Sequence, residues 1–480
     1  MTTAKKTVFG TFWNVLLNIF NQASSLIVYA LLARILNVEQ FGLIAFCFLM
    51  TEMVILFGNF GVNQILIQKS RWSNRLASSC FWFLLLISIV FAMILALIIA
   101  PISNNFFYTG SGMMLASLAL APIINSLSLV SLARMQRNFQ YRPIAVVNAV
   151  STTIGGGTSV FMVFQGYGVW AVVFGKLLQT TITTVLFVLY DKFIPMTVIK
   201  LKHVKVILNF GLPLFYTTCL NFFSSKSINF ITAFLLGSAQ FAFVSVAQRA
   251  SRMLSEVTMT PLNATLLPAF SRVSRNTNLS DVYIRVVKIA SVLIVPLYFG
   301  VAAIAEEVVF IVFGAQWEVS AELLRVLCFT ISANVLGWFL PSMLVARGHT
   351  ALVFKLNFYA MLSNIILITL GALHSVEGAV YGLFLSTIVT VIIKFRLVKS
   401  KVDISLTKVF LASLPALISS VVMVIVSFIT FKYADLETTM FSLLILKILL
   451  GVFTYCALMF TVFYKHSKHV STDLFSVLKK

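Results

Sequence analysis

The feature that most constrains this chain is a run of apolar residues, long enough to cross a membrane, that recurs from one end to the other. A helix of about 20 residues crosses the roughly 30 Å hydrocarbon core of a bilayer. Of the 480 residues, 60% are hydrophobic and only 10% are charged, whereas a soluble protein carries about a quarter charged residues. The ~10-residue alternating segments of a membrane β-barrel are missing. The sequence therefore predicts an all-α polytopic membrane protein.

We expect about fourteen transmembrane helices, numbered here in chain order. Their predicted ranges are 9–33, 41–64, 79–103, 112–134, 144–166, 168–190, 207–235, 239–263, 286–312, 319–345, 354–374, 376–397, 407–431 and 440–464. The first range follows two lysines, but it contains Asn14, Asn18 and Asn21 and is too long and too polar for a cleaved signal peptide. This segment is therefore expected to remain in the membrane.

The distribution of basic residues predicts the orientation. With the N-terminus in the cytoplasm, 27 of the 35 Lys and Arg residues fall on the inner side, and two, Arg34 and Lys432, fall on the outer side. This pattern follows the positive-inside rule and predicts a multi-pass protein of a bacterial inner membrane with both termini in the cytoplasm. The net charge of +21 therefore indicates topology and contact with anionic membrane lipids. No nucleic-acid partner is expected.

An internal repeat divides the chain into two similar halves. Asn21-Gln-Ala-Ser-Ser25 aligns with Asn221-Phe-Phe-Ser-Ser225, and Leu36–Phe41 aligns with Leu236–Phe241, both at an offset of 200 residues. The offset equals six predicted helices, an even number, so the two copies share one orientation across the membrane. We predict six-helix lobes at 1–190 and 207–398, a basic cytoplasmic linker at 191–206, an additional helix pair at 405–465 and a cytoplasmic tail at 466–480.

Ionisable residues inside the predicted helices are candidates for function, because a Lys, Arg or Asp at a helix centre costs about 2.5–3.5 kcal/mol. Eight positions qualify: Glu52, Lys176, Lys226, Arg249, Arg252, Glu256, Arg325 and Lys447. Two of them have a structural explanation. Arg325 is expected to pair with Glu322 on its own helix, and Lys447 is expected to extend toward the outer membrane surface.

The remaining charges gather in the two lobes and predict an anion-binding cleft. Arg249, Arg252 and Glu256 share one helix face, and the repeat places Glu52 at the position of Arg252. Arginine offers a bidentate fork to phosphate, and lysine acts as a point charge. The predicted substrate-binding residues are Arg249, Arg252, Lys226, Lys176, Asn21, Asn221 and Gln179, and the ion-coupling candidates are Glu52 and Glu256. The alternative is that these charges only neutralise each other and stabilise the bundle.

Catalytic motifs are missing from the sequence. It has no Walker lysine loop, no paired-carboxylate motif and no His/Cys metal cluster, so we expect neither an enzyme nor a cofactor nor a metal. Without an ATP site, transport must use an ion gradient or the substrate's own gradient. Gly155-Gly-Gly157 lies inside a predicted helix, where it indicates close helix packing or a flexible bend.

Several short segments together resemble a known family. They are Leu132–Phe139, Gly166–Trp170 with Gly175-Lys-Leu-Leu, Leu267–Arg272, Phe313–Trp317 and Ala346–His349. The chain resembles the Wzx-type polysaccharide repeat-unit flippases, in particular the colanic-acid-exporter-like branch, within the superfamily of multidrug, oligosaccharidyl-lipid and polysaccharide transporters. The resemblance implies two six-helix lobes around a central cavity, alternating access, and an oligosaccharide linked to undecaprenyl pyrophosphate as substrate. It carries over no site residues, because intramembrane cations recur in the family without a fixed motif.

The sequence thus predicts a flippase that moves lipid-linked repeat units from the cytoplasmic to the periplasmic leaflet for surface polysaccharide biosynthesis, with a polysaccharide polymerase as a further partner. One alternative is an ion-coupled multidrug or cation antiporter of the same superfamily, which would favour an acidic, aromatic cavity. Another is a membrane polymerase or ligase, which would be expected to carry a large outer loop bearing Arg or His.

Overall fold

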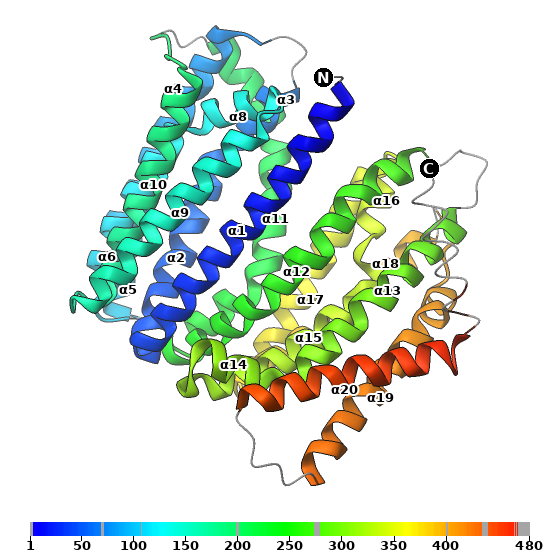
Figure 1. The fold of residues 1–480 in the computed structure, drawn as a ribbon. Coiled ribbons are helices and arrows are strands. Elements are labelled where there is room, and N and C mark those ends of the chain that lie inside the picture. The colour runs from blue at the N-terminus through cyan, green and yellow to red at the C-terminus, as the bar shows by residue number, and fades with distance from the viewer. Residues whose placement is uncertain are drawn as a thin grey trace. The chain divides into compact units, whose positions relative to one another are not determined.

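The computed structural model describes residues 3–68, 72–106, 108–197, 201–272, 279–399, 402–433, 440–464, 466 and 468. Within these residues, every regular element is a helix, as the sequence predicts (Figure 1). The chain forms two compact units. The first comprises Met1–Phe222 and Gly237–Ala242, and the second comprises Phe223–Leu236 and Phe243–Lys480. The predicted lobe boundaries at 190 and 207 remain a prediction.

The first unit contains ten α-helices, one π-helical segment and the first part of α11. The elements are α1 (Thr3–Ile35), α2 (Val38–Asn59), α3 (Val62–Gln68), α4 (Asn74–Ile94), η1 (Leu95–Ile99), α5 (Ala100–Phe106), α6 (Ser111–Leu118), α7 (Leu120–Ser126), α8 (Leu129–Arg137), α9 (Tyr141–Phe164), α10 (Val169–Asp191) and α11 (Leu201–Leu235). Since α11 begins at Leu201, residues 201–206 of the predicted linker are helical.

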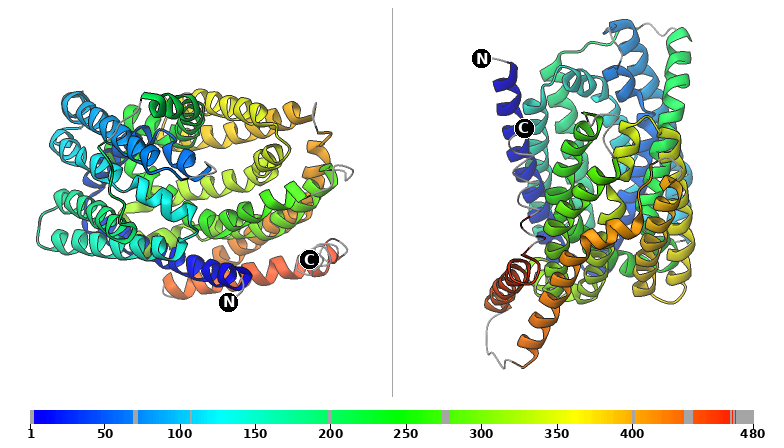
Figure 2. Two further views of the ribbon diagram at one scale, coloured as in Figure 1. Left: turned by 90° about the horizontal axis from the view of Figure 1, so that it is seen from above. Right: turned by 90° about the vertical axis from the view of Figure 1, so that its right-hand side faces the viewer.

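The second unit contains the end of α11 and the helices that follow it. They are α12 (Ser238–Arg272), α13 (Leu279–Ala303), α14 (Ala305–Phe313), η2 (Ala315–Trp317), α15 (Glu318–Trp338), α16 (Leu340–Ala346), α17 (Thr350–Ala372), α18 (Val376–Lys399), α19 (Leu406–Tyr433) and α20 (Met440–Phe460). In the region of the predicted additional pair, α20 packs on α19 and α19 packs on α13 (Figures 1 and 2).

Each predicted membrane span is occupied by helix, but the number fourteen is not confirmed. In the described part of the chain, eleven helices are long and apolar enough to cross a membrane, or twelve if the bent pair Ser111–Ser126 and Leu129–Arg137 counts as one span. Two of the long helices, α1 and α12, fall outside this set. In α1 the qualifying apolar stretch is the shorter Ile19–Ile35, and α12 carries Arg249, Arg252 and Glu256. The chain is a multi-pass membrane protein.

Several spans that the sequence predicts as continuous are interrupted, among them the second, which turns at Phe60 and Gly61 between α2 and α3. The fourth is bent by 40° where α7 gives way to α8, and here the hydroxyls of Ser126 and Ser128 donate to the carbonyls of Ile123 and Asn125. Such local hydrogen bonds compete with the helical ladder. The ninth predicted span ends at Ala303, and a separate short helix, α14, follows it.

The internal repeat recurs in the backbone. The helices α1 and α11 end at Ile35 and Leu235, and α2 and α12 begin at Val38 and Ser238, so both turns keep the offset of 200 residues. The backbone hydrogen bonds repeat as well, from residue 36 to 32 and from 41 to 37 in the first turn, and at the same positions plus 200 in the second. Phe41 and Phe241 are both buried. The two halves therefore build the same helix–turn–helix.

Two of the three consecutive glycines of α9 lie in close contact with neighbouring helices of the first unit. A Cβ at Gly155 would lie 2.5 Å from Cβ of Gln179 and 2.7 Å from the carbonyl oxygen of Gly175, both on α10. A Cβ at Gly156 would lie 2.6 Å from a methyl group of Val28 on α1. At Gly157 nothing lies within 4 Å. Of the two predicted meanings of this motif, the structure supports close helix packing.

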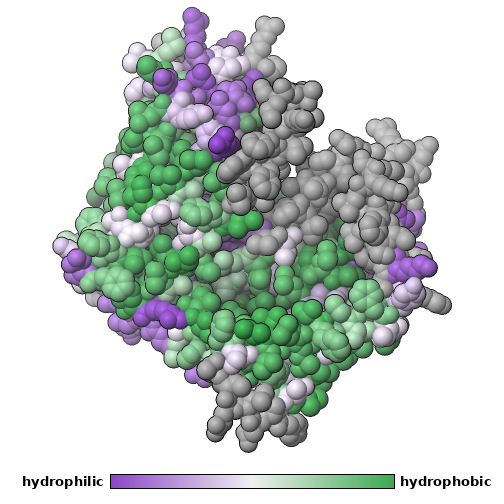
Figure 3. All heavy atoms as spheres, viewed as in Figure 1, coloured by the Kyte–Doolittle hydropathy of each residue, from purple (hydrophilic) through white to green (hydrophobic). Residues whose placement is uncertain are grey.

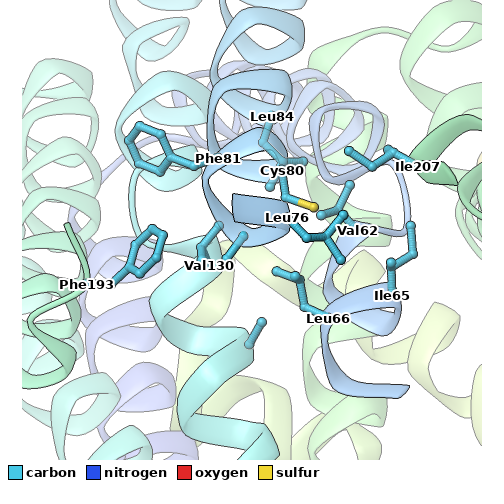
Figure 4. Packing of buried hydrophobic residues seen from close by; sticks show 12 residues of the cluster. Val62, Ile65, Leu66, Leu76, Cys80, Phe81, Leu84, Val130, Phe193 and Ile207 are labelled. Carbon is cyan, nitrogen blue, oxygen red and sulfur yellow. The ribbon is translucent and has the colours of Figure 1, made fainter. Parts of the chain in front are cut away.

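A core of apolar side chains lies at one end of the first unit, where α3, α4, α8 and the start of α11 meet (Figure 4). It includes Val62, Leu66, Cys80 and Ile207. The segment after α10 is fixed to α4 beside this core. The indole of Trp82 donates to the carbonyl of Met196 at 2.9 Å, and the amide of Met196 donates to the hydroxyl of Ser78 at 2.9 Å.

The outer surface fits a lipid environment. On the face of the first unit shown in Figure 3, hydrophilic residues gather at the two ends of the helices and hydrophobic residues cover the length between them. Large apolar side chains on α4, such as Leu86 and Met93, are exposed. Backbone groups in lipid must find their partners within the segment, and these helices satisfy them internally.

Candidate functional site

Two of the predicted site residues come together in the first unit. Lys176 is half-buried near the middle of α10 and interacts electrostatically with Glu52 of α2. The Glu52 side chain is exposed, whereas Thr51 beside it is buried. A cation of α10 and an acid of α2 therefore lie within electrostatic range of each other in this unit.

Gln179 and Asn21 belong to the same unit. Gln179 lies one helical turn after Lys176, and its amide donates to the hydroxyl of Thr152 on α9 at 3.0 Å. Asn21 is half-buried on α1, and its Oδ1 is enclosed and accepts no hydrogen bond within the described residues. The side chains of Asn14 and Asn18 lie outside the described part of α1.

The second unit holds most of the predicted cations. Arg249, Arg252 and Glu256 lie along α12, and Lys226 is half-buried on α11. Arg252 is exposed and Ser251 beside it is buried. The same pattern occurs 200 residues earlier on α2, where Glu52 is exposed and Thr51 is buried. Glu256 is half-buried, and its Oε2 has no hydrogen-bond partner among the described residues.

Asn221 is exposed on α11 and belongs to the first unit. The predicted site residues are thus divided between the units, with Asn21, Glu52, Lys176, Gln179 and Asn221 in the first. Among the predicted residues of the second unit, the cations Lys226, Arg249 and Arg252 outnumber the acid Glu256. The single cleft that the repeat predicts remains a prediction.

A hydrogen-bonded group near Lys226 was not identified from the sequence. The amide of Asn364 on α17 donates to the carbonyl of Ser224 on α11 at 3.0 Å, and the hydroxyl of Ser386 on α18 donates to Oδ1 of Asn364 at 2.6 Å. The available signal was the presence of Asn364 and Ser386 inside apolar stretches. The group connects three helices of the second unit beside the segment that carries Lys226.

Lys394 is a second residue that the sequence analysis did not select. It lies in the predicted span 376–397 and in α18, is half-buried, and runs over Gly337 of α15, where a Cβ would meet its Cδ at 3.4 Å. No carboxylate of the described residues forms an ion pair with it. Its position one turn inside the end of the predicted span was the signal that could have identified it.

Two predicted structural roles are corrected. Arg325 does form an ion pair, but its partner is Glu306 on α14, at 2.8 Å, and not Glu322. Lys447 does not extend to the membrane surface. It pairs with Glu307, which is only 3% exposed, and lies over the ring of Phe431. A buried ammonium and a buried carboxylate each need the opposite charge beside them, and this pair supplies both.

Among the described residues, no group of three or more His, Cys, Asp and Glu side chains could hold a metal ion. The predicted site residues carry groups that bind polar ligands. Guanidinium and ammonium groups bind phosphate, and amides and hydroxyls donate to and accept from sugar hydroxyls.

Comparison with known proteins identifies the family of the chain. Residues 31–322 match the sequence profile of a family described as polysaccharide biosynthesis protein. The chain is 21% identical over 319 residues to the succinoglycan biosynthesis transport protein ExoT of Rhizobium meliloti (strain 1021), covering 66% of this chain and 65% of that protein. It is 22% identical over 445 residues to the lipopolysaccharide biosynthesis protein WzxC of Escherichia coli (strain K12), covering 88% of each. The chain thus spans just under two thirds of the first relative and most of the second.

Solved structures share the fold. The inward closed conformation of the lipid II flippase MurJ superposes with a TM-score of 0.77 at 17% identity, over 94% of this chain and 98% of that one. An inward-facing multidrug resistance transporter of the MATE family and MOP superfamily superposes with a TM-score of 0.63 at 14% identity, over 82% and 96% of the two chains. The helical fold is therefore that of a membrane transporter.

Proposed function

The chain belongs to the polysaccharide biosynthesis protein family, and on this premise we propose that it moves a lipid-linked oligosaccharide across the bacterial inner membrane. The substrate is the repeat unit of a surface polysaccharide carried on undecaprenyl pyrophosphate, and it passes from the cytoplasmic to the periplasmic leaflet. The protein catalyses no reaction on it. A polysaccharide polymerase receives the product on the outer side.

The observation that carries this proposal is the surplus of positive charge among the intramembrane site residues. In the first unit Lys176 interacts electrostatically with Glu52, and among the predicted site residues of the second unit the cations Lys226, Arg249 and Arg252 outnumber the single acid, Glu256. Cations inside a membrane are costly, and an anionic substrate bound to them would offset that cost. A pyrophosphate supplies two negative groups, and arginine binds such groups with paired hydrogen bonds.

The remaining parts of the proposal follow from this site. Both termini lie in the cytoplasm, and the two lobes expose the substrate to one side of the membrane and then to the other. Asn21, Asn221 and Gln179 contact the sugars. Glu52 and Glu256 are the residues that couple an ion, and Glu256 is the stronger candidate because its enclosed Oε2 accepts no hydrogen bond from the described residues.

A multidrug or cation antiporter is the alternative, and the likeness to a MATE transporter supports its fold. A cationic drug requires an excess of acids in its binding site, and the predicted site residues of the second unit carry an excess of cations. Efflux of a cationic dye by cells that produce the chain would favour the antiporter.

Replacing both Arg249 and Arg252 by alanine tests the proposal. Surface polysaccharide should be abolished at unchanged protein level, and the lipid-linked repeat unit should accumulate. The matched control is Arg396→Ala, which removes an exposed arginine from the last turn of α18 and should leave the polymer unchanged. Normal polymer in the double variant would overturn the site assignment.

A further inference from the structure

A small cavity with apolar walls and several amide side chains lies inside the first unit, and none of the predicted charged residues lines it. It has a volume of about 200 Å³ and is enclosed by α2, α3, α4, α8 and α11. The apolar side chains at its base, Val62, Leu66 and Leu84, belong to the core shown in Figure 4. All of its lining residues lie in the first unit.

The turn between α2 and α3 forms one wall of the cavity. Phe60 and Gly61 both adopt the left-handed conformation, with φ of 41° and 68°, which is unusual for a phenylalanine. The Phe60 ring stacks on the ring of Phe215, with centroids 4.9 Å apart and an angle of 23°. A Cβ at Gly211 would lie 2.8 Å from the carbonyl oxygen of Phe60, so α11 crosses this turn closely. Packing therefore holds the strained turn in place.

The lining combines amides, a hydroxyl and an aromatic ring, without any charged side chain. Asn59, Asn63, Gln64, Thr218 and Phe215 all contribute to it. The amide of Asn63 donates to Oε1 of Gln136 on α8 at 3.1 Å, and its Oδ1 is enclosed with no hydrogen-bond partner among the described residues. The side-chain amides of Asn59 and Gln64 also make no hydrogen bond to any described residue.

These features select a neutral ligand with several hydroxyl groups. Amides both donate and accept, as hydroxyls do, and a ligand site typically combines apolar walls with a few polar groups that fix orientation. A phosphate would enter this cavity without a cation to balance it, which is unfavourable. At about 30 Å³ for each water, the cavity of about 200 Å³ has room for about seven waters, and therefore for no more than one sugar ring.

We propose that this cavity binds one neutral monosaccharide unit of the transported oligosaccharide. The inference rests on the proposed function, since it assigns the sugar and the pyrophosphate to different places in the molecule. The charged residues hold the anion, and the amide-lined cavity of the first unit recognises the sugar. This cavity therefore contributes to the choice of repeat unit.

Cysteine protection tests this assignment on the full-length chain, purified in lipid nanodiscs. Thr217 and Thr218 are adjacent on α11, and each hydroxyl donates to the carbonyl four residues earlier, at 2.9 and 2.8 Å. Only Thr218 lines the cavity. Thr218→Cys and Thr217→Cys are therefore a matched pair, made in a chain that carries Cys219→Ser and Cys456→Ser, because Cys47, Cys80 and Cys328 are buried.

The rate of reaction with N-ethylmaleimide is measured with D-glucose, D-galactose, D-mannose, L-fucose or inorganic pyrophosphate. A sugar at about ten times its Kd should slow labelling of Thr218→Cys about tenfold by occupancy, while Thr217→Cys and the pyrophosphate samples stay unchanged. If none of the sugars slows Thr218→Cys, or if both cysteines slow equally, the cavity is not a sugar site. That result would leave the Arg249 and Arg252 test intact, since polymer export is measured separately.

Discussion

At the scale of single residues, the second unit contains two ion pairs of different character. Lys447 and Glu307 pair deep in the protein, with side chains 16% and 4% exposed, whereas Arg325 and Glu306 are 39% and 65% exposed. Removing one partner of a buried pair leaves an uncompensated charge in a low dielectric medium. An exposed pair is already solvated by water and contributes little.

This contrast gives a stability prediction. Lys447→Met should destabilise the protein by about 3–5 kcal/mol, because Glu307 then remains buried and unpaired. Adding Glu307→Leu should restore most of that stability, and Arg325→Ala should cost no more than about 1 kcal/mol. Unfolding of the purified protein in detergent measures all three. A double variant as unstable as the single one would show that the pair is not the cause.

The sequence identified these charged positions but not their partners. Arg325 and Lys447 stand out because they interrupt apolar helices, and the expected roles were local, an i–3 pair and extension toward the surface. The actual partner of Lys447 is 140 residues away in the chain, and that of Arg325 lies on the separate helix α14. Contacts between helices distant in sequence cannot be obtained from the periodicity of one helix.

At the scale of elements, helix packing depends on where the glycines of α9 face. Gly155 and Gly156 are in contact with α10 and α1, whereas Gly157 faces open space. The sequence predicted either close packing or a bend for the whole motif. It could not say which glycine faces a neighbour, because three consecutive residues point in three directions around a helix.

Single alanine substitutions separate these positions. Gly155→Ala should destabilise the protein by about 1–3 kcal/mol, because its methyl group overlaps Cβ of Gln179 and the backbone of Gly175. Gly157→Ala should be neutral or stabilising by up to about 1 kcal/mol, since alanine favours a helix. The midpoint of thermal unfolding checks both. Equal midpoints for the two variants would contradict the packing described for α9.

Helix continuity was the weakest part of the sequence prediction. Hydropathy places a span at 112–134 and another at 286–312, but the chain breaks them into shorter helices. At the first of these breaks the hydroxyls of Ser126 and Ser128 donate to nearby carbonyls, which competes with the helical hydrogen bonds. A window of apolar residues averages over such local competition and does not detect it.

At the scale of the whole molecule, the sequence was most informative. The all-α membrane fold follows from apolar runs alone, and the repeat offset of 200 residues recurs at both helix–turn–helix segments. The family follows from motifs that are spread over the chain, and residues 31–322 match it. The cleft that would combine Lys176 with Arg249 depends on how distant helices are arranged, which the repeat alone does not determine.

The central claim is that this chain carries an oligosaccharide on its lipid carrier to the outer leaflet. The most direct test measures how much of the lipid-linked repeat unit in spheroplasts is oxidised by periodate, which reacts with sugar diols and does not cross the membrane. Spheroplasts with the chain should show oxidation of the repeat unit, whereas those lacking it should accumulate a protected, cytoplasmic form that the restored gene exposes again. Equal oxidation with and without the chain would contradict the account.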